Sequence, residues 1–247
     1  MCLKSYLLGM SYPIHHTPTA LITGGSRGLG FALAQALASR RWRLVIDGRD
    51  HAALEAAATT LQRDTSVEAV AGDVADPSHR AQLTSRIPGG RLDVLVNNAS
   101  ELGPTPLPTL ADTTDRTLSD VLRVNALAPL DLVRRSLARL QAAGGIVINI
   151  SSDAAVEAYP GWGLYGASKA ALDQISRVLA VEHPELSVYA FDPGDMRTGM
   201  HQAAFPGEDI SDRPEPKSVV PSLLRIIDER PASGRLTHAG LSPGKVS

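Results

Sequence analysis

The sequence has almost no cysteine, little net charge and no long apolar run. Cys2 is the only cysteine among 247 residues, so no disulfide can form within the chain, which fits a reducing cytoplasm. The net charge of −2 gives no basic field that would attract nucleic acid or an anionic membrane. No stretch is apolar for long enough to span a bilayer. We therefore expect a cytoplasmic protein with neither a nucleic-acid nor a membrane partner.

Metal-ligand spacing is also missing. The histidines are scattered along the chain, at positions 15, 16, 51, 79, 183, 201 and 238. No combination of them has the spacing of a zinc site, and we expect no metal.

Length and composition indicate one folded domain. A chain of 247 residues suits one large domain better than two. Hydrophobic residues make up 43% and charged residues 20%, as in soluble globular proteins. Residues 1–18 lack a signal-peptide core and are expected to form a flexible leader. We expect the folded domain to cover 19–240 and a C-terminal tail to cover 241–247.

Short apolar segments alternate with helical patterns along this domain. The segments expected to form buried strands are 19–23, 43–47, 67–70, 93–96, 146–150 and 186–191. Helical patterns cover 31–38, 52–61, 114–142 and 165–181. This alternation predicts an α/β fold: a single doubly wound parallel-sheet Rossmann domain with helices on both faces. Ligands of such a sheet bind beyond the carboxyl ends of its strands.

A glycine-rich turn joins the first predicted strand to the first predicted helix. Gly24, Gly28 and Gly30 permit a tight turn and let backbone N–H groups approach a pyrophosphate at the start of the helix. Such turns are common in proteins, but the position between a strand and a helix favours a dinucleotide site. The other turn residues expected to bind the dinucleotide are Ser26, Arg27 and Leu29.

Two arginines favour NADP over NAD. An NAD enzyme usually places a carboxylate at the end of the second strand to bind the ribose 2′-hydroxyl, whereas a 2′-phosphate calls for arginine. Here Gly48 holds that position and Arg49 follows it, while Arg27 belongs to the glycine turn. Two guanidinium groups suit a dianion. A shift of one residue would instead aim Asp47 at the ribose and favour NAD.

Tyr165 and Lys169 form the clearest catalytic pattern. Residues four apart share one face of a helix, so the phenol and the ammonium point into the same space. The ammonium would stabilise the phenolate and lower the pKa of Tyr165 from its usual value of about 10. We expect Tyr165 to exchange a proton with a substrate.

Taken together, these motifs resemble those of the short-chain dehydrogenase/reductase family, over residues 19–200. Ser152 and Asn125 precede Tyr165 at the spacing that the family pattern expects. The other matching residues are Asp73, Val74, Asn97, Ala99, Pro193, Gly194 and Thr198.

The resemblance implies a catalytic role for four residues. Tyr165 would be the general acid in reduction and the base in oxidation. Ser152 would hold the substrate oxygen by a second hydrogen bond, and strand alternation sends its neighbour Ser151 to the opposite side. Lys169 would bind the nicotinamide ribose and lower the pKa of the tyrosine. Asn125 would position a water that links Lys169 to solvent.

The resemblance also implies the contacts of the cofactor. Asp73 would meet the adenine, Asn97 and Ala99 would line the path of the dinucleotide, and Thr198 would bind the carboxamide. The remaining cofactor-binding residues would be Val74, Pro193, Gly194 and Met196, with Tyr165 and Lys169 also touching the cofactor.

Two segments flank the expected position of the nicotinamide and would line a substrate pocket. They contain Glu157, Tyr159, Trp162, Met200, His201 and Phe205; packing or surface exposure explains each of these residues equally well. Residues 205–216 carry no periodicity and are expected either to form a mobile cover over the substrate or to be an ordinary surface loop.

The sequence departs from the family pattern at two places. Ser100 stands where the family usually has glycine. Residues 233–238 lack the usual ending, which completes a last strand and often helps to assemble tetramers. We therefore expect a homodimer formed through the helices at 114–142 and 165–181.

The sequence as a whole predicts an NADP-dependent oxidoreductase that reduces a ketone or aldehyde to an alcohol by hydride transfer, with NADP(H) as cofactor and a small-molecule carbonyl or alcohol as substrate. Two alternatives stay open. One is a dinucleotide-binding regulator without catalysis. The other is an isomerase or cyclase on the same scaffold, with no net redox change.

Overall fold

The computed structural model of the protein describes residues 16–241. Over this range one sheet of seven parallel strands has the order β3-β2-β1-β4-β5-β6-β7, which confirms the predicted doubly wound α/β fold. The strands are β1 (Thr19–Ile22), β2 (Arg43–Gly48), β3 (Val67–Ala71), β4 (Val94–Asn97), β5 (Ile146–Ile150), β6 (Ser187–Asp192) and β7 (Gly234–Thr237).

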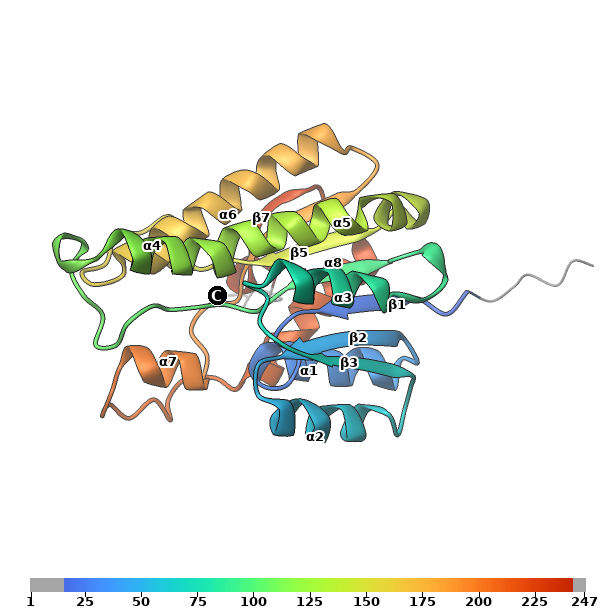
Figure 1. Cartoon of the computed structure of the whole chain (residues 1–247), viewed down its shortest axis with the longest axis horizontal. Coiled ribbons are helices and arrows are strands. Elements are labelled where there is room, and N and C mark those ends of the chain that lie inside the picture. Colours follow the sequence, from blue (N-terminus) through green and yellow to red (C-terminus); the bar gives the residue numbers. More distant parts are fainter. Residues whose placement is uncertain (1–15, 242–247) are drawn as a thin grey trace, which may run out of the picture.

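Helices cover both faces of this sheet, as Figure 1 shows. The helices are α1 (Gly28–Ser39), α2 (His51–Leu61), α3 (Pro77–Ser85), α4 (Asp115–Leu122), α5 (Ala128–Ala143), α6 (Gly163–Glu182), α7 (Gly199–Ala204), α8 (Val220–Glu229) and α9 (His238–Leu241). Apolar side chains of α1, α2 and α8 pack on one face, and those of α3, α5 and α6 pack on the other.

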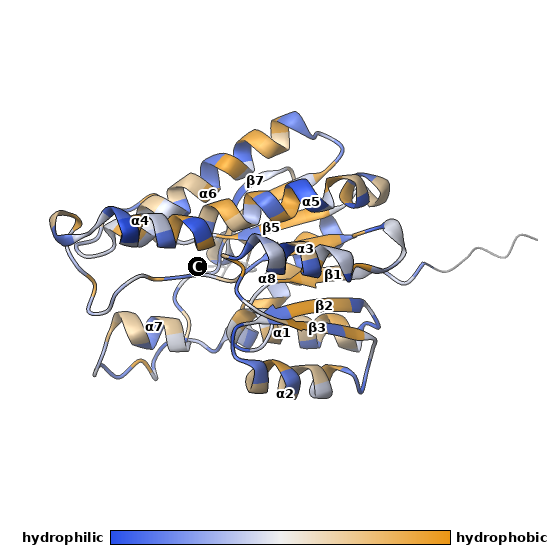
Figure 2. Ribbon diagram, viewed as in Figure 1, coloured by the Kyte–Doolittle hydropathy of each residue, from blue (hydrophilic) through white to orange (hydrophobic). Residues whose placement is uncertain are grey.

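The two faces of the sheet arise from side-chain alternation along its strands. In β1, Ala20 and Ile22 face α1 and α8, whereas Leu21 faces α3 and α5. All three side chains are fully buried. Figure 2 shows the result, with apolar strands between helices whose outer surfaces are hydrophilic. A sheet buried on both faces needs strands that are apolar throughout, and this explains why the sequence revealed them.

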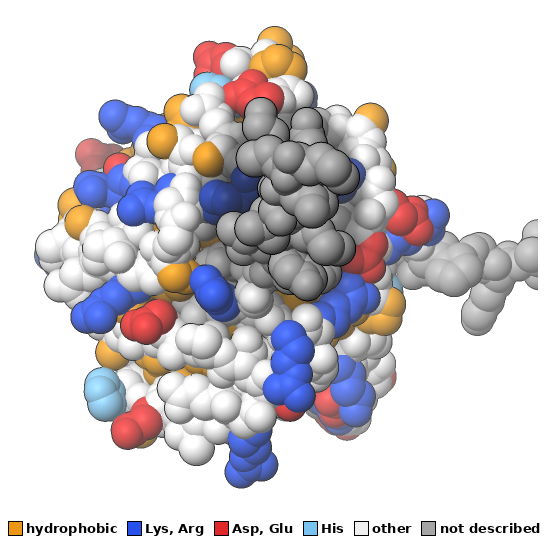
Figure 3. All heavy atoms as spheres, turned by 90° about the vertical axis from the view of Figure 1, so that its right-hand side faces the viewer, with side chains coloured by type: hydrophobic (Ala, Val, Ile, Leu, Met, Phe, Trp, Pro, Cys, Tyr) orange, Lys and Arg blue, Asp and Glu red, His pale blue; other side chains and the backbone are white. Residues whose placement is uncertain are grey.

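The amino ends of the strands lie on the right of Figure 1, and their carboxyl ends lie on the left, beside α7. Figure 3 shows the right-hand side, where Lys and Arg side chains lie among Asp and Glu side chains. None of the helices within residues 16–241 is both long and apolar enough to cross a membrane.

The long helix predicted at 114–142 is interrupted. Between α4 and α5 lies a π-helical segment, Arg123–Leu127, in which one extra residue is inserted into the helical turn. Each flanking helix is amphipathic, so the pattern predicted helix on both sides of the insertion. Asn125 lies inside this π segment.

The structure adds elements that the sequence pattern did not predict, namely α3, α7, α8, α9 and β7. The strand β7 forms although residues 233–238 lack the expected ending, because its main chain pairs with β6 from Tyr189 to Asp192. The hydrogen bonds between these two strands join main-chain atoms, and they therefore do not require that sequence motif.

The expected leader and tail lie outside the described residues, except for 16–18 and Leu241. His16 contacts Asp93 at 3.0 Å, and Leu241 ends α9. The limits of the domain stay predictions, as does the mobility of residues 205–216.

Candidate active site

A single large cleft of about 1180 Å³ lies beyond the carboxyl ends of the strands. Its walls come from the glycine turn, the ends of β2 to β6, the start of α6 and the segment around α7. This is the position at which parallel α/β sheets bind ligands.

Most of the predicted site residues line this cleft. They are Gly24, Ser26, Arg27, Gly28, Leu29, Arg49, Asp73, Val74, Ala99, Ser152, Tyr165, Lys169, Pro193, Gly194, Met196 and Thr198. The predicted substrate-side residues Tyr159, Trp162, Met200, His201 and Phe205 also line it, whereas Glu157 does not.

Gly30, Asn97 and Asn125 do not line the cleft but support it from behind. A Cβ on Gly30 would lie 2.4 Å from the carbonyl oxygen of Gly24, so this glycine allows the turn to fold tightly. The amide of Asn97 is buried and donates to Asn149 Oδ1 at 2.7 Å.

The glycine turn leaves space at the start of α1. Gly28 has φ +59°, and a Cβ built on it would meet only Thr198 Cγ2, at 3.9 Å. No side chain caps the first turn of α1, which also contains no acidic residue. Uncapped N–H groups at a helix start form an anion-binding position, and this fits a pyrophosphate.

Asp47 does not face the cleft as a free carboxylate. One oxygen accepts from the N–H of Gly24 at 2.6 Å, and the other contacts His79 Nε2 at 3.0 Å. Both side chains are almost fully buried, and burial raises the pKa of Asp47. This partner of Asp47 was not predicted from the sequence, because His79 lies on the polar helix α3.

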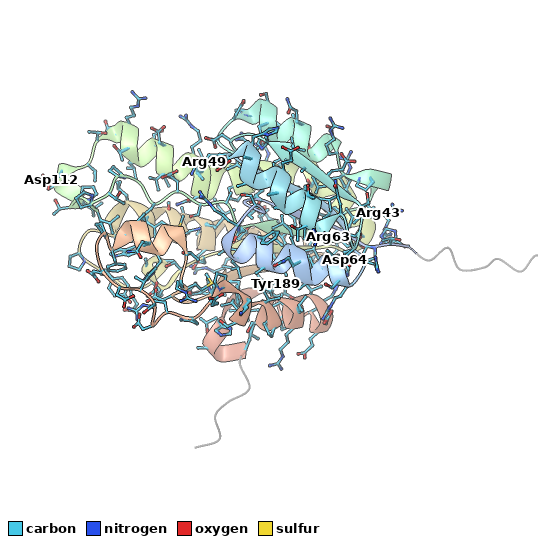
Figure 4. The ribbon with its side chains drawn as sticks, turned by 90° about the horizontal axis from the view of Figure 1, so that it is seen from below. Arg43, Arg49, Arg63, Asp64, Asp112 and Tyr189 are labelled. Atoms are coloured by element: carbon cyan, nitrogen blue, oxygen red, sulfur yellow. The ribbon has the colours of Figure 1, made fainter. Side chains whose placement is uncertain are left out.

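The two predicted arginines differ in their surroundings. Arg49 extends from the end of β2, near the start of α2 (Figure 4), and its Nη1 pairs with Glu101 Oε2 at 3.0 Å. Arg27 is exposed, and its side chain makes no hydrogen bond or ion pair within the described part of the chain, whereas its carbonyl oxygen accepts from the N–H of Phe31. Glu101 also lines the cleft and was not predicted as a site residue.

Tyr165, Ser152 and Lys169 meet at the centre of the cleft. Tyr165 and Lys169 are buried on one face of α6, with Lys169 Nζ 5.5 Å from the centroid of the tyrosine ring. Nζ donates to the carbonyl oxygen of Ile150 at 2.7 Å. Ser152 begins the short 3-10 turn after β5, and its hydroxyl donates to Asp153 at 2.8 Å.

The neighbouring serine points the other way, as strand alternation predicts. Ser151 is buried, and its hydroxyl donates to Asp173 Oδ1 at 2.5 Å. Of these two serines, Ser152 is the one whose hydrogen bond acts on the ionisation of Tyr165.

Burial dominates the ionisation of both catalytic candidates. It raises the pKa of Tyr165 to about 12, although hydrogen bonds with Ser100 and Ser152 act in the opposite direction. It lowers the pKa of Lys169 to about 8, against the charge of Asp173. The pKa of Tyr165 is thus raised, not lowered as expected, because desolvation of the phenol outweighs its hydrogen bonds.

Asn125 holds the cleft wall together. Its Oδ1 accepts from Ser100 Oγ at 3.1 Å and from the N–H of Glu101 at 2.7 Å. Its Nδ2 donates to the carbonyl oxygen of Glu101 at 2.7 Å and to Ser168 Oγ at 2.8 Å. All hydrogen-bonding positions of the side chain are thus used, and none is left for a water.

An aromatic cluster forms the substrate side of the cleft. The ring of Trp162 lies edge-on to Tyr165 at 5.7 Å and packs against Phe205 at 6.0 Å. His201 stacks on Phe205 at 4.9 Å. Tyr159 donates its hydroxyl proton to Asp153 at 3.0 Å, which ties the loop before α6 to the residue after Ser152.

The chain is similar in sequence to known dehydrogenases and reductases. A model of the short chain dehydrogenase family matches residues 18–209. The chain is 32% identical over 242 residues to sepiapterin reductase of Bos taurus, with 92% of this chain and 86% of that protein covered. It is 36% identical over 172 residues to the short chain dehydrogenase penD of Penicillium thymicola, covering 66% of this chain but only 62% of that protein.

Solved structures of short-chain dehydrogenases have the same fold. A short-chain dehydrogenase from Sphingobium yanoikuyae in complex with NADPH has a TM-score of 0.78 and 29% identity, covering 88% of this chain and 87% of that one. A short chain dehydrogenase from Shigella flexneri has a TM-score of 0.83 and 26% identity, covering 93% of this chain and 94% of that one.

Proposed function

This chain belongs to the short-chain dehydrogenase/reductase family, and we propose that it is an NADP-dependent oxidoreductase that reduces a ketone or aldehyde to an alcohol. The observation that carries the proposal is that Tyr165, Ser152 and Lys169 share one cleft with the glycine turn. The aromatic cluster around Trp162 suits a moderately hydrophobic carbonyl compound. We assign it to the cytoplasm on the ground of its single cysteine.

The cleft has the space and the polar groups that a dinucleotide needs. A Cβ on Gly194 would meet nothing within 4 Å, and one on Gly28 would meet only Thr198. The uncapped start of α1 would take the pyrophosphate, and the complex of the Sphingobium relative with NADPH supports the same ligand here. The residues that would hold the adenine, ribose and nicotinamide are Asp73, Val74, Ala99, Pro193, Met196 and Thr198.

The surroundings of Asp47 support the phosphorylated form of the cofactor. Because both oxygens of Asp47 are engaged, this carboxylate would neither bind a 2′-hydroxyl nor meet a 2′-phosphate directly. Arg27 is available to that phosphate, and Arg49 becomes available when it leaves Glu101.

When bound, the reduced nicotinamide supplies the hydride for the carbonyl carbon. The hydroxyl of Tyr165 donates its proton to the carbonyl oxygen. The hydroxyl of Ser152, once it turns from Asp153, donates a second hydrogen bond to the same atom. A pKa of about 12 keeps Tyr165 protonated at neutral pH, and this is the state that reduction requires.

Lys169 and Asn125 support this proton donor. The bond from Lys169 to Ile150 fixes the ammonium beneath the tyrosine ring. Since the side chain of Asn125 is saturated, a water relaying protons from Lys169 would bind the main chain of the π segment, where the regular helical pattern is broken.

The function is tested by following NADPH absorbance with a panel of ketones and aldehydes. We expect oxidation of NADPH in step with carbonyl consumption. Tyr165→Phe removes the proton donor and should lower kcat by about 100- to 10,000-fold, while NADPH affinity stays unchanged. Turnover without net redox change would support the isomerase or cyclase alternative, and binding of NADPH without turnover of any carbonyl would support the regulator.

The cofactor preference is tested by titrating NADPH and NADH into the wild type and three variants. Arg27→Ala and Arg49→Ala should each weaken NADPH binding roughly 10- to 100-fold and leave NADH binding unchanged. Glu101→Gln releases Arg49 and should tighten NADPH binding only. Equal affinity of the wild type for NADPH and NADH would refute the assignment.

A further inference from the structure

Arg235 in β7 joins three walls of the cleft from behind. Its Nη1 donates to Ser151 Oγ at 3.3 Å and to Asp173 Oδ2 at 3.2 Å. Its Nη2 donates to the carbonyl oxygen of Ser152 at 3.0 Å and to Asp192 Oδ2 at 2.9 Å. The guanidinium side chain is 23% exposed, so these four contacts are made largely out of water.

The four partners of Arg235 come from three parts of the site, because Ser151 and Ser152 belong to the same segment. Ser152 is the candidate that would bind the substrate oxygen. Asp173 lies one helical turn after Lys169 on the same face of α6. Asp192 ends β6, and its Oδ1 accepts from the N–H of Gly194 at 2.9 Å, which shapes the turn on the nicotinamide side.

The charges of this cluster make it sensitive to the loss of the arginine. The side chains of Asp173 and Asp192 are 3% and 10% exposed. Two buried carboxylates this close to each other need a counter-charge, and a planar guanidinium can serve both with directed hydrogen bonds. Without it, the carboxylates would draw water or move apart, and both the Ser152 loop and the Gly194 turn would follow.

We propose that Arg235 is a positioning residue that sets the Ser152 loop and the turn at Asp192–Gly194 relative to Tyr165. The expected loss of kcat rests on the proposed reductase function. The expected change in the position of the loop and the turn does not. Arg235 does not touch the reacting atoms. It acts through the main chain of Ser152 and through the carboxylate of Asp192.

The test compares Arg235→Lys and Arg235→Ala with Arg40→Ala. Arg40 is the matched control because it also binds a carboxylate, that of Asp228 at 2.8 and 3.0 Å, but on the surface and away from the cleft. Arg235→Lys keeps the charge and loses the two-pronged geometry. Arg235→Ala loses both.

Two measurements are made on each variant. Steady-state kinetics and NADPH titration should show kcat reduced by about 10- to 100-fold in both Arg235 variants, with the NADPH Kd within about threefold of the wild type. Millimolar guanidinium should restore part of the kcat of Arg235→Ala and none of that of Tyr165→Phe. Arg40→Ala should behave as the wild type.

Amide hydrogen exchange separates the positioning role from the reaction itself. In Arg235→Lys, residues 151–158 and 192–198 should exchange about tenfold faster than in the wild type, with residues 23–30 unchanged. An inactive wild type would refute the proposed function, and the exchange would still decide the role of Arg235. Unchanged hydrogen exchange in these two segments would overturn the proposed role of Arg235. An unchanged kcat in a folded Arg235→Lys variant would overturn it as well. If Arg235→Ala does not fold, the test relies on Arg235→Lys.

Discussion

We expect the buried Lys169 to set the pH range of the proposed reaction. Burial lowers the pKa of Lys169 to about 8 and raises that of Tyr165 to about 12. As pH rises through about 8, Lys169 loses its proton first, and with it the positive charge next to the developing alkoxide. Tyr165 keeps its proton through the same interval.

The kcat/KM for carbonyl reduction should therefore fall as pH rises through about 8. The measurement is a pH profile of NADPH oxidation at low substrate concentration. Lys169→Arg, whose guanidinium keeps its charge, should have a lower but flatter profile. A wild-type rate that stays constant or increases through this interval would contradict the role given to Lys169.

Single residues were predictable where their spacing along the chain fixes their direction. The choice of Ser152 over Ser151 stays a prediction, and the hydrogen bond from the buried Ser151 hydroxyl to Asp173 is consistent with it. The engagement of Asp47 by His79 was not predictable, because the two meet only when α3 folds against β2. Ser100 was noted only as a departure from glycine, yet its hydroxyl contacts Asn125 and acts on Tyr165.

Among secondary-structure elements, five strands that are buried on both faces were predictable from their apolar sequence, namely β1, β2, β4, β5 and β6. The edge strand β3 was also predicted, although most of its residues are exposed or half-buried. The polar helix α3 was not, since it has little apolar periodicity and rests on its Asp76 cap and the proline at its start. The strand β7, whose residues are half-buried or exposed, was missed because it also lacks an apolar pattern. The π segment was invisible because a single inserted residue hardly changes a helical pattern on either side of it.

For the whole molecule, exposed apolar side chains on one helix support the expected homodimer. Val178 and Val181 lie one turn apart on α6 with 41% and 81% of their surface exposed. Leu127, at the start of α5, is 55% exposed. Apolar side chains grouped on the surface mark interaction sites, and these positions lie on the two helices predicted to form the interface.

Light scattering coupled to size exclusion should give the wild type twice the mass of one chain. A variant with Val178→Glu and Val181→Glu would bury charge at the interface and should be monomeric. Val156→Glu serves as the control, because Val156 is 61% exposed but follows η4 (Asp153–Ala155) and is not on either helix predicted to form the interface; it should leave the mass unchanged. A monomeric wild type, or a double variant that keeps the doubled mass, would exclude this interface.

The aromatic cluster on the substrate side belongs to a small apolar group of its own, with Leu102, Ala154, Tyr165 and Ala204 at its centre, apart from the two large groups that flank the sheet. Substitutions at Met200 or Phe205 should therefore leave the packing of those two large groups intact. If the proposed function holds, we expect such a separation to let selection, in nature or in the laboratory, change the preferred substrate without loss of thermal stability.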